Sequence, residues 1–439
     1  MKKMKRIAAL LLSAVCIFAM TACGKTGTGS NQGGPSSSTE EALQVSAPVT
    51  IEFWHTLSAD GATALDEMVA EFNKSNQYGI TVNATYQGGY YDVLSKTIAS
   101  HGTDTAPTIV LIGAGGIEQL ADAGAVADMS KYVERDNYDL SNFPDSLRYY
   151  MEHYDGQVIE FPYLVSTAVI YYNKALMTTE PTTLEEWISI SESITKANPG
   201  VYGMGMQLDT GFIQRPILKS LGAPGLTTAD GEGPATLDDG TLEKYLTDWQ
   251  KWITDGHCMG ISVTDSGSQM TNKFANGQLA SFCSSTANME NMKKLAKENG
   301  IDLGVAKMVG YGGYHAAIGG GGLSVLSSAT QQEKAAAWEF LKFLFEDENV
   351  IKLHKSSSYL PFTNSASASA DLATYWGENP GYKVATEQLE WATYNEWSIY
   401  LSEWRQQVGN CFTAVLVDGS MTPQEAVEYL RTQVPVIFP

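Results

Sequence analysis

The strongest constraint on the fold is an alternation of strand and helix patterns over residues 49–112. Residues 49–54 and 80–86 have the apolar patterns of strands, and the apolar residues between them recur at helical spacing. A second helical stretch begins near Tyr91, and the short apolar run 108–112 follows it. This β-α-β-α-β order predicts a parallel sheet with right-handed crossovers.

A second α/β unit is expected from about residue 167, where residues 167–172 again have the composition of a strand. Later helix starts are marked by a Thr followed three residues on by a Glu, a spacing that lets the two side chains cap the first turn. These pairs are Thr183 with Glu186, Thr330 with Glu333, and Thr422 with Glu425, the last with Pro423 at the first helical position. Glycine-rich residues 310–322 precede a further strand pattern at 323–326. The sequence therefore predicts two α/β lobes joined by more than one crossing of the chain.

The first 22 residues have the pattern of an export signal, with a basic start and an apolar run of 14 residues, 7–20. That run is shorter than the roughly 20 residues that a membrane-spanning helix needs. Cys23 follows, and residues 24–47 are polar and glycine-rich, which is typical of a flexible tether. The ensemble resembles a bacterial lipoprotein signal, in which Cys23 becomes the lipid-bearing first residue of the mature protein. An ordinary secretory signal with an incidental cysteine is the alternative.

The formal net charge of −21 argues against a nucleic-acid partner, because an acidic surface repels phosphate backbones. Beyond Cys23 the chain has three cysteines, Cys258, Cys283 and Cys411, which permit one disulfide at most. Their spacing does not match a metal site, and the histidines are scattered, so neither a metal nor another cofactor is expected.

The ends of the predicted strands carry aromatic residues beside glycines. Trp54 ends the first strand, Gly-Gly-Tyr-Tyr at 88–91 follows the second, and Gly-Ala-Gly-Gly at 113–116 follows the third. Ligands of open parallel sheets bind beyond the carboxyl ends of the strands, where loops leave a crevice. Rings that stack on an apolar face, next to backbone that approaches closely, suit a sugar. Packing between the lobes is the competing interpretation of these aromatics.

A series of motifs resembles the extracellular solute-binding proteins of ABC importers, in the branch that includes maltose and glycerol-3-phosphate binders. The motifs run in order from about residue 48 to 432, and they are Ile51-Glu-Phe-Trp-His55, Gly88-Gly89-Tyr90, Phe161-Pro162, Ser166-Thr167, Tyr171-Tyr172-Asn173-Lys174, Phe274-Ala-Asn-Gly277, Gly319-Gly320, Tyr359-Leu360-Pro361 and Thr422-Pro423-Gln424-Glu425-Ala426. The resemblance implies an α/β protein with the two-lobed type II periplasmic-binding-protein fold, each lobe a mostly parallel sheet flanked by helices. Such a clamshell closes on a ligand held between its lobes.

The resemblance also implies how the chain is divided. A signal peptide at 1–22 and a tether at 23–47 precede an N-terminal lobe, 48–162 plus 303–358, and a C-terminal lobe, 163–302 plus 359–439. Hinge crossings are expected near 161–166, 301–305 and 359–361. A monomer anchored by its lipid to the outer face of the cytoplasmic membrane would deliver its ligand to the transmembrane subunits of a permease.

The same resemblance implies which residues contact the ligand. They are Tyr90, Ser166, Phe212, Ser285 (with Ser284 as a near rival), Gly320, Tyr359 and, among the aromatics of the C-terminal arm, Trp397. Core packing is an alternative for that arm, because Trp391, Tyr394 and Trp397 lie at i, i+3 and i+6, roughly on one helical face.

Two departures from the glycerol-3-phosphate binders favour an uncharged ligand. The acidic residue after the third strand is replaced by Ala114 or Gly115, and the arginine of the C-terminal arm by Ser398, with Arg405 seven residues further on. Phosphate recognition usually uses a fixed cation or a nest of amides. We therefore expect a mono- or oligosaccharide, with glycerol 3-phosphate or a related phosphodiester as the alternative.

Two functions of other classes remain open on the sequence. An exported glycoside-acting enzyme needs two carboxylates about 5–10 Å apart, and the nearest candidates, Glu160 and Asp209, are expected to face solvent. The Gly-x-Ser-x-Gly motif of α/β-hydrolases does not occur, so no enzymatic activity is expected. A surface lectin that takes no part in transport would have the same anchor and cleft.

Overall fold

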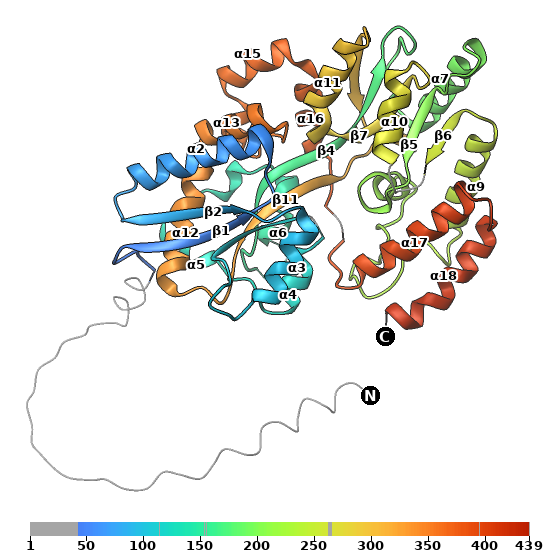
Figure 1. The fold of residues 1–439 in the computed structure, drawn as a ribbon. Helices are drawn as coiled ribbons and strands as arrows, with labels where there is room; N and C mark the ends of the chain where they lie inside the picture. Colours follow the sequence, from blue (N-terminus) through green and yellow to red (C-terminus); the bar gives the residue numbers. More distant parts are fainter. Residues whose placement is uncertain are drawn as a thin grey trace, which may run out of the picture. The chain divides into compact units, whose positions relative to one another are not determined.

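The computed structural model of the chain describes residues 43–113, 115–152, 154, 156–261, 266–394 and 396–438 (Figure 1). The expected signal, Cys23 and most of the expected tether lie outside the described residues. The described part of the chain belongs to one unit, residues 40–439.

Nine strands of the described residues form a mixed sheet in the order β2-β1-β3-β11-β4-β7-β5-β6, with β8 paired to β4. Strands β9 and β10 form a separate two-stranded ribbon. The strands are β1 Val49–His55, β2 Ile80–Tyr86, β3 Ile109–Gly113, β4 Phe161–Asn173, β5 Met204–Gln207, β6 Cys258–Ile261, β7 Ser281–Ser285, β8 Leu303–Lys307, β9 Val309–Gly310, β10 Gly313–Tyr314 and β11 Ile318–Val325.

The first strand group, β2-β1-β3, has the parallel arrangement that the sequence predicted. Strand β1 pairs with β2 along its whole length and with β3 near its carboxyl end. Helix α2 (Ala59–Ser75) joins β1 to β2, and α3 (Tyr90–Ser100) joins β2 to β3. The apolar residues of α2 at helical spacing, among them Leu65, Met68 and Phe72, are buried, and burying each contributes about 1.5–3 kcal/mol.

Strand β4 joins the first strand group to the second group, β7-β5-β6. Its residues 161–167 pair with β11, whereas residues 168–173 pair with β7 and β8. Strand β11 pairs in turn with β3. Every pair that involves β4 or β11 is antiparallel, so the sheet is mixed rather than mostly parallel.

The glycine run 319–322 lies inside β11, although the sequence predicted a strand only from residue 323. Gly320 has φ +99°, and a Cβ on it would lie 1.6 Å from the carbonyl oxygen of Leu164 in β4. A Cβ on Gly322 would lie 2.4 Å from Cγ of Glu160. Glycine has a low intrinsic preference for strands, which is why the glycine run did not predict a strand. Here the glycines mark positions where neighbouring segments of the chain approach closely.

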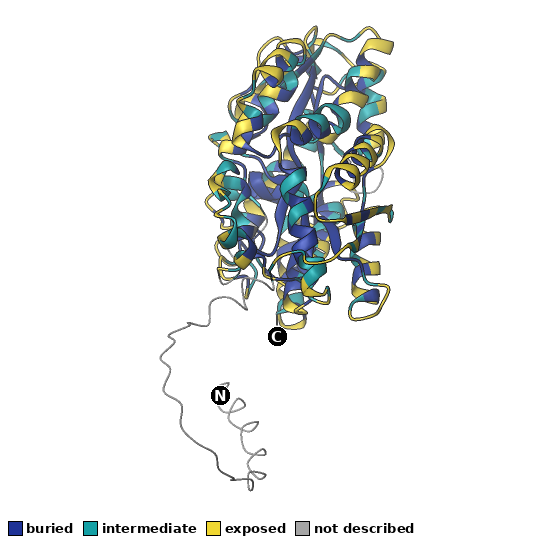
Figure 2. Ribbon diagram, turned by 90° about the vertical axis from the view of Figure 1, so that its left-hand side faces the viewer, coloured by how far each residue is buried: buried dark blue, intermediate teal, exposed yellow. Residues whose placement is uncertain are grey.

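Helices flank the buried strands, and Figure 2 shows that their outward faces are exposed. Thr330 and Thr422 form complete capping boxes with Glu333 and Glu425, as predicted. The Thr183 side chain accepts a hydrogen bond from the backbone N–H of Glu186. The capping box is incomplete, because the Glu186 carboxylate accepts from the backbone N–H of Thr182. The other helices are α4 Ile117–Asp122, α5 Ser130–Arg135, α6 Tyr149–Glu152, α7 Leu184–Ala197, α8 Arg215–Lys219, α9 Thr241–Thr254, α10 Ser266–Ala275, α11 Met289–Glu298, α12 Gln331–Leu344, α13 Asp347–Ser357, α14 Asn364–Ser367, α15 Ala370–Glu378, α16 Pro380–Glu387, α17 Leu401–Leu416 and α18 Pro423–Ile437.

The predicted hinge crossings lie in different parts of the sheet. Segments 161–166 and 359–361 are neighbours, because Leu360 and Val165 form an antiparallel bridge. Segment 301–305 leads into β8, which pairs with residues 169–173 of β4. The segment by which the chain later returns to the first strand group is β11, which pairs with β3. The lobe boundaries themselves stay a prediction.

The cysteines contribute to the core. Cys258, Cys283 and Cys411 are buried and free, and Cys258 begins β6. Among the described residues, no helix has both the length and the apolar character needed to cross a membrane.

The turn after α13 is held by a buried histidine. Nδ1 of His354 lies 2.7 Å from the carbonyl oxygen of Tyr359, and the indole N–H of Trp376 donates to Nε2 of His354 at 3.1 Å. Because Nε2 accepts, the ring is neutral, with its proton on Nδ1. Burial lowers the pKa of His354 to about 4, and the bond to Tyr359 opposes that shift.

We predict that His354 makes the protein less stable as the pH falls from 6.5 toward about 4. In that window the unfolded chain binds a proton that the folded chain excludes, so the contribution is complete above pH 6.5 and is lost below it, by about 3 kcal/mol in all. Denaturant unfolding across this range should show the loss in the wild type and in His257→Gln, and a smaller loss in His354→Gln. Equal pH dependence in all three proteins would contradict the assignment.

Candidate functional site

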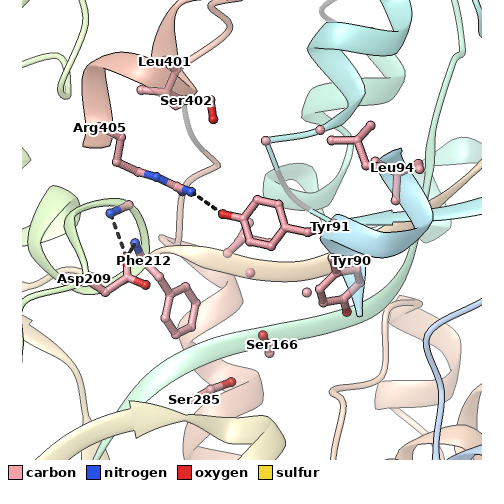
Figure 3. A pocket seen from close by; sticks show the side chains of 18 of the residues that line it. Tyr90, Tyr91, Leu94, Ser166, Asp209, Phe212, Ser285, Leu401, Ser402 and Arg405 are labelled. Carbon is pink, nitrogen blue, oxygen red and sulfur yellow. Dashed lines mark hydrogen bonds between the residues drawn. The ribbon is translucent and has the colours of Figure 1, made fainter. Parts of the chain in front are cut away.

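A cavity of about 370 Å³ opens at the carboxyl ends of several strands (Figure 3). Its walls come from the turns after β2, β3, β5 and β7, from β4 and β11, and from the start of α17. The lining residues are Tyr90, Tyr91, Leu94, Ile112, Gly113, Gly115, Gly116, Gln119, Ser166, Asp209, Gly211, Phe212, Ser285, Ala287, Ile318, Gly319, Gly320, Tyr359, Leu401, Ser402 and Arg405. The cavity therefore lies where the sequence placed a ligand site, beyond the ends of the strands.

Two tyrosines from distant parts of the chain meet on one side of the cavity. The hydroxyl oxygens of Tyr90 and Tyr359 are 3.3 Å apart, and the Tyr90 hydroxyl also interacts with the side chain of Thr56. Burial raises the pKa of Tyr90 well above its ordinary value, and the neighbouring Tyr359 raises it further. Burial raises the pKa of Tyr359 as well. Both phenols therefore stay protonated and can donate to an oxygen of a ligand.

The glycines of the cavity leave space for its rings. A Cβ on Gly319 would lie 2.5 Å from the Phe212 ring, and one on Gly113 would lie 2.7 Å from the Tyr90 ring. Both distances are shorter than a van der Waals contact, so a larger residue would displace the rings. The glycines that the sequence showed beside aromatic residues thus allow rings and backbone to lie in contact.

The charged residues of the cavity come from the turn after β5 and from α17. Oδ1 of Asp209 accepts from the backbone N–H groups of Gly211 and Phe212, each at 2.8 Å. Arg405 donates to the Tyr91 hydroxyl at 3.2 Å, as Figure 3 shows. The cavity thus combines aromatic rings with one carboxylate and one guanidinium.

A buried arginine holds the turn that carries Asp209 and Phe212. The Arg215 side chain is fully buried, and its Nε donates to the carbonyl oxygen of Gly211 at 3.2 Å. Its terminal nitrogens donate to the Thr393 carbonyl oxygen at 2.8 Å and to Glu396 at 3.2 Å. Because Thr393 also accepts from the backbone N–H of Ile318, this arginine connects two walls of the cavity. A well-paired buried charge of this kind keeps the turn in one position.

Two serines contribute hydroxyls. Ser166 on β4 is buried, and Ser285 ends β7, where its Oγ accepts from the backbone N–H of Ala287 at 3.2 Å. The hydroxyl hydrogen of Ser285 is therefore free to point toward a ligand. Ser284, the near rival, does not line the cavity.

The structure brings six of the seven predicted ligand-contacting residues to this cavity. They are Tyr90, Ser166, Phe212, Ser285, Gly320 and Tyr359. Trp397 packs instead against Tyr154, with ring centroids 5.1 Å apart, and belongs to a small apolar cluster around Ile117. Trp376 and Trp404, two other aromatics of the C-terminal arm, are buried in the core. The expected helical face of Trp391, Tyr394 and Trp397 does not form, because these residues lie between the short helix at 388–390 and α17 rather than on a helix.

Three charged residues lie in positions that the sequence did not predict. Glu160 is buried, and burial, followed by the charge of Glu118, raises its pKa well above the usual value. Asp209 lines the cavity instead of facing solvent. Arg405, which the sequence placed only by its distance from Ser398, lines the cavity and bonds to Tyr91. The cavity therefore contains a fixed cation, although the sequence suggested that the arginine of the glycerol-3-phosphate binders had been lost. No local pattern in the sequence indicated this placement, because Arg405 and its partner Tyr91 are 314 positions apart.

The arrangement suits recognition of a polar ligand with apolar faces. Rings can cover C–H surfaces, while hydroxyls, the carboxylate and the guanidinium pair with hydroxyl or anionic groups. Over the described ranges, no cluster of three or more His, Cys, Asp or Glu side chains is placed to hold a metal ion.

A family model described as bacterial extracellular solute-binding protein matches residues 67–381. The sn-glycerol-3-phosphate-binding periplasmic protein UgpB of Salmonella typhimurium is 29% identical over 372 residues, covering 79% of this chain and 82% of that protein. Its counterpart in one Escherichia coli strain is 28% identical over 369 residues, covering 78% and 81%.

Solved structures share the fold. UgpB from Mycobacterium tuberculosis in complex with glycerophosphocholine has a TM-score of 0.75 at 21% identity, covering 89% of this chain and 98% of that chain. The sugar-binding protein MalE from Xanthomonas citri has a TM-score of 0.77 at 20% identity, covering 89% and 97%. The predicted type II periplasmic-binding-protein fold is thereby confirmed. With most of its length matched by the family model, the chain belongs to the bacterial extracellular solute-binding proteins, the substrate-binding components of ABC importers.

Proposed function

We propose that the protein binds a small carbohydrate in the cavity beside Tyr90 and Tyr359 and delivers it, chemically unchanged, to the membrane permease of an ABC importer. The observation that carries the proposal is the placement of three rings, Tyr90, Phe212 and Tyr359, around the serine hydroxyls of one cavity. A sugar presents C–H faces to such rings and hydroxyls to the polar groups between them. The protein acts as a monomer.

Closure of two lobes on the ligand would transmit binding to the permease. In the predicted division the cavity takes Tyr90 from the N-terminal lobe and Phe212, Tyr359 and Arg405 from the C-terminal lobe. A ligand that contacts both walls binds the closed form more tightly and so shifts the equilibrium toward it. The Tyr91–Arg405 and Tyr90–Tyr359 contacts support this, because each joins the two proposed lobes.

A phosphate-bearing polyol is the second candidate, and Arg405 favours it. The named function of the curated relatives is binding of sn-glycerol 3-phosphate, and the Mycobacterium tuberculosis relative was solved with glycerophosphocholine. A guanidinium beside tyrosine hydroxyls can bind a phosphate through charge-assisted hydrogen bonds. Asp209 lines the same cavity. Its negative charge disfavours an anionic ligand and its oxygens accept hydrogen bonds from hydroxyl groups, so a carbohydrate is the preferred candidate.

We predict that Tyr359→Ala and Tyr90→Ala each weaken ligand binding by about 1–3 kcal/mol, because each removes a ring from a largely desolvated cavity. Calorimetry with a panel of mono- and oligosaccharides, glycerol 3-phosphate and glycerophosphocholine would identify the ligand and then measure the loss. Tyr86→Ala is the matched control, since Tyr86 is 56% exposed and lies outside the cavity. Unchanged affinity together with a lower melting temperature would show that the two rings only pack the core. Binding of glycerol 3-phosphate without any sugar response would overturn the choice of a carbohydrate.

We predict that Arg405→Gln separates the two candidate ligands. Loss of the guanidinium should weaken a phosphate-bearing ligand about tenfold to a hundredfold, since a hydrogen bond to a charged group contributes about 1.5–3 kcal/mol. The same substitution should weaken binding of a neutral sugar by less than about fivefold, since a hydrogen bond between neutral groups contributes less free energy than one to a charged group. Arg431→Gln on α18, where the arginine pairs with Asp238, is the control for the loss of one positive charge. The same small loss for every ligand would rule out phosphate recognition by Arg405.

We also propose that Cys23 carries the lipid that anchors the protein outside the cell. The proposal is supported by the signal pattern before Cys23 and the polar, glycine-rich stretch after it. We predict that Cys23→Ala moves the protein from the membrane fraction to the soluble fraction, whereas Cys16→Ala does not. Mass spectrometry of the N-terminal peptide would check the modification, and an unmodified Cys23 in the wild-type protein would contradict it.

A further inference from the structure

A buried carboxyl group lies behind the ligand cavity. Glu160 immediately precedes β4 and is only 5% exposed. Its Oε1 atom makes no hydrogen bond within the described part of the chain. A Cβ on Gly322 of β11 would lie 2.4 Å from Cγ of Glu160, so the glutamate side chain packs directly against that glycine. A buried carboxyl group with an unsatisfied oxygen is rare in a folded protein and calls for an explanation.

The Glu160 side chain lies on the far side of the strand that forms the floor of the cavity. A Cβ on Gly321 of β11 would lie 2.8 Å from the ring of Tyr90, which lines the cavity. Successive residues of a strand face opposite sides of the sheet, so Gly322 faces away from that ring. Glu160, which packs against Gly322, therefore supports β11 from behind.

A second buried glutamate lies next to Glu160. Glu118 is 1% exposed and belongs to the first turn of α4, whose N-cap, Gly116, lines the cavity. Ile117 and Ile159, the residues that precede the two glutamates, pack in one small apolar cluster. Burial raises the pKa of Glu160 well above its ordinary value, and the charge of Glu118 raises it further. The two carboxyl groups thus lie between α4, one wall of the cavity, and β11, its floor.

The other titratable groups near the pair are phenols. Burial, and then the charge of Glu160, raise the pKa of Tyr394, which comes from the segment before α17. Tyr149 on α6 faces the other glutamate, and burial raises its pKa to about 12. Glu396 and Arg215 act on Tyr149 rather than on Glu160. In the part of the chain that the structure describes, no lysine or arginine forms an ion pair with Glu160.

The surroundings of Glu160 therefore accommodate its neutral form. An ionised carboxylate at this position would have an unsatisfied oxygen and would repel Glu118. The unfolded chain exposes the same carboxyl group to water and ionises it from about pH 4.5. At neutral pH the folded chain thus binds a proton that the unfolded chain has released. That proton stabilises the fold until the pH rises far enough to ionise Glu160.

We infer that Glu160 is a proton switch behind the ligand cavity. At neutral pH its protonated carboxyl group allows α4 to pack against β11. At alkaline pH the proton passes to the solvent, the two glutamates repel each other, and α4 and β11 separate. The cavity then loses the contact between one wall and its floor, so ligand affinity falls. The effect on the ligand rests on the proposed function, whereas the switch itself does not.

Infrared spectroscopy tests the protonation. At pH 7 the wild-type protein should show the C=O stretching band of a protonated, buried carboxyl group, and the band should disappear at alkaline pH. Glu160→Gln should lack the band, and Glu298→Gln, at the exposed end of α11, should keep it. A wild-type protein without the band at pH 7 would overturn the inference, as would loss of the band in Glu118→Gln alone.

Amide hydrogen exchange, corrected for the intrinsic rate at each pH, tests the conformational change. Between pH 6 and pH 9, protection of α4 and β11 should fall at least about tenfold in the wild type and less than about threefold in Glu160→Gln. Helix α9 is the internal control, and its protection should stay within about threefold in both proteins. Equal losses in the wild type and in Glu160→Gln would contradict the switch.

Glu118→Gln keeps the inference testable if Glu160→Gln does not fold. Without the charge of Glu118, Glu160 should lose its proton at a lower pH, so the infrared band and the protection of α4 should be lost together at that lower pH. A midpoint that does not move from its wild-type value would contradict the pairing of the two glutamates.

Calorimetry with maltose and with glycerophosphocholine tests the effect on the ligand. Whichever probe binds at pH 6 should bind at least about threefold more weakly to the wild type at pH 9, with a smaller change in Glu160→Gln. Constant affinity despite the loss of protection would overturn the link to the cavity. If neither probe binds at either pH, the proposed ligand fails, while the infrared band and the exchange rates still decide whether the switch exists.

Discussion

The close contact between β4 and β11 is the constraint on which the site depends. Gly320 has no Cβ, and its Cα lies so near the carbonyl oxygen of Leu164 that a Cβ would overlap it. That approach places Ser166 of β4 and Gly319 of β11 side by side, and it leaves room for the Phe212 ring above Gly319. The same two strands join the strand groups on either side, so the floor of the cavity is also the connection between the two halves of the sheet.

The walls of the cavity are held from behind by buried polar groups. Arg215 fixes the turn of Asp209 and Phe212 to the segment that leads into α17, and His354 holds the backbone of Tyr359. Neither side chain lines the cavity. A site supported in this way loses little freedom when a ligand binds, because its side chains are already in place, and preorganisation of this kind raises affinity without any additional contact. Removing Glu396 would leave the Arg215 charge buried without its carboxylate, which is strongly destabilising, whereas removing Arg215 would leave Glu396 paired with Lys219 at 3.5 Å.

Charge in the cavity is sparse although the chain as a whole is strongly acidic. One carboxylate and one guanidinium face a space that is otherwise lined by rings, glycines and hydroxyls. In such a setting each charge can affect selectivity strongly, because no other charged side chain of the described residues lines the cavity. In the proposed function, Asp209 and Arg405 together would decide between a neutral polyol and a phosphate. The sequence placed Arg405 only by its distance from Ser398, so it could not show that both charges line one cavity.

The sequence by itself determined the elements whose patterns are local. The strand, helix and strand order of residues 49–112 appeared as predicted, as did the helix starts at Thr330 and Thr422, because alternation, helical spacing and capping act within a few residues. It also identified the rings and hydroxyls of the cavity through a series of motifs. Tertiary structure alone decided which of these groups meet. It put the glycine run into a strand, moved Trp397 into a packing cluster and brought Arg405 to Tyr91, residues 314 positions apart. The physical reason is that contacts between distant segments depend on how β4 and β11 cross the sheet, and no pattern within either segment specifies that crossing.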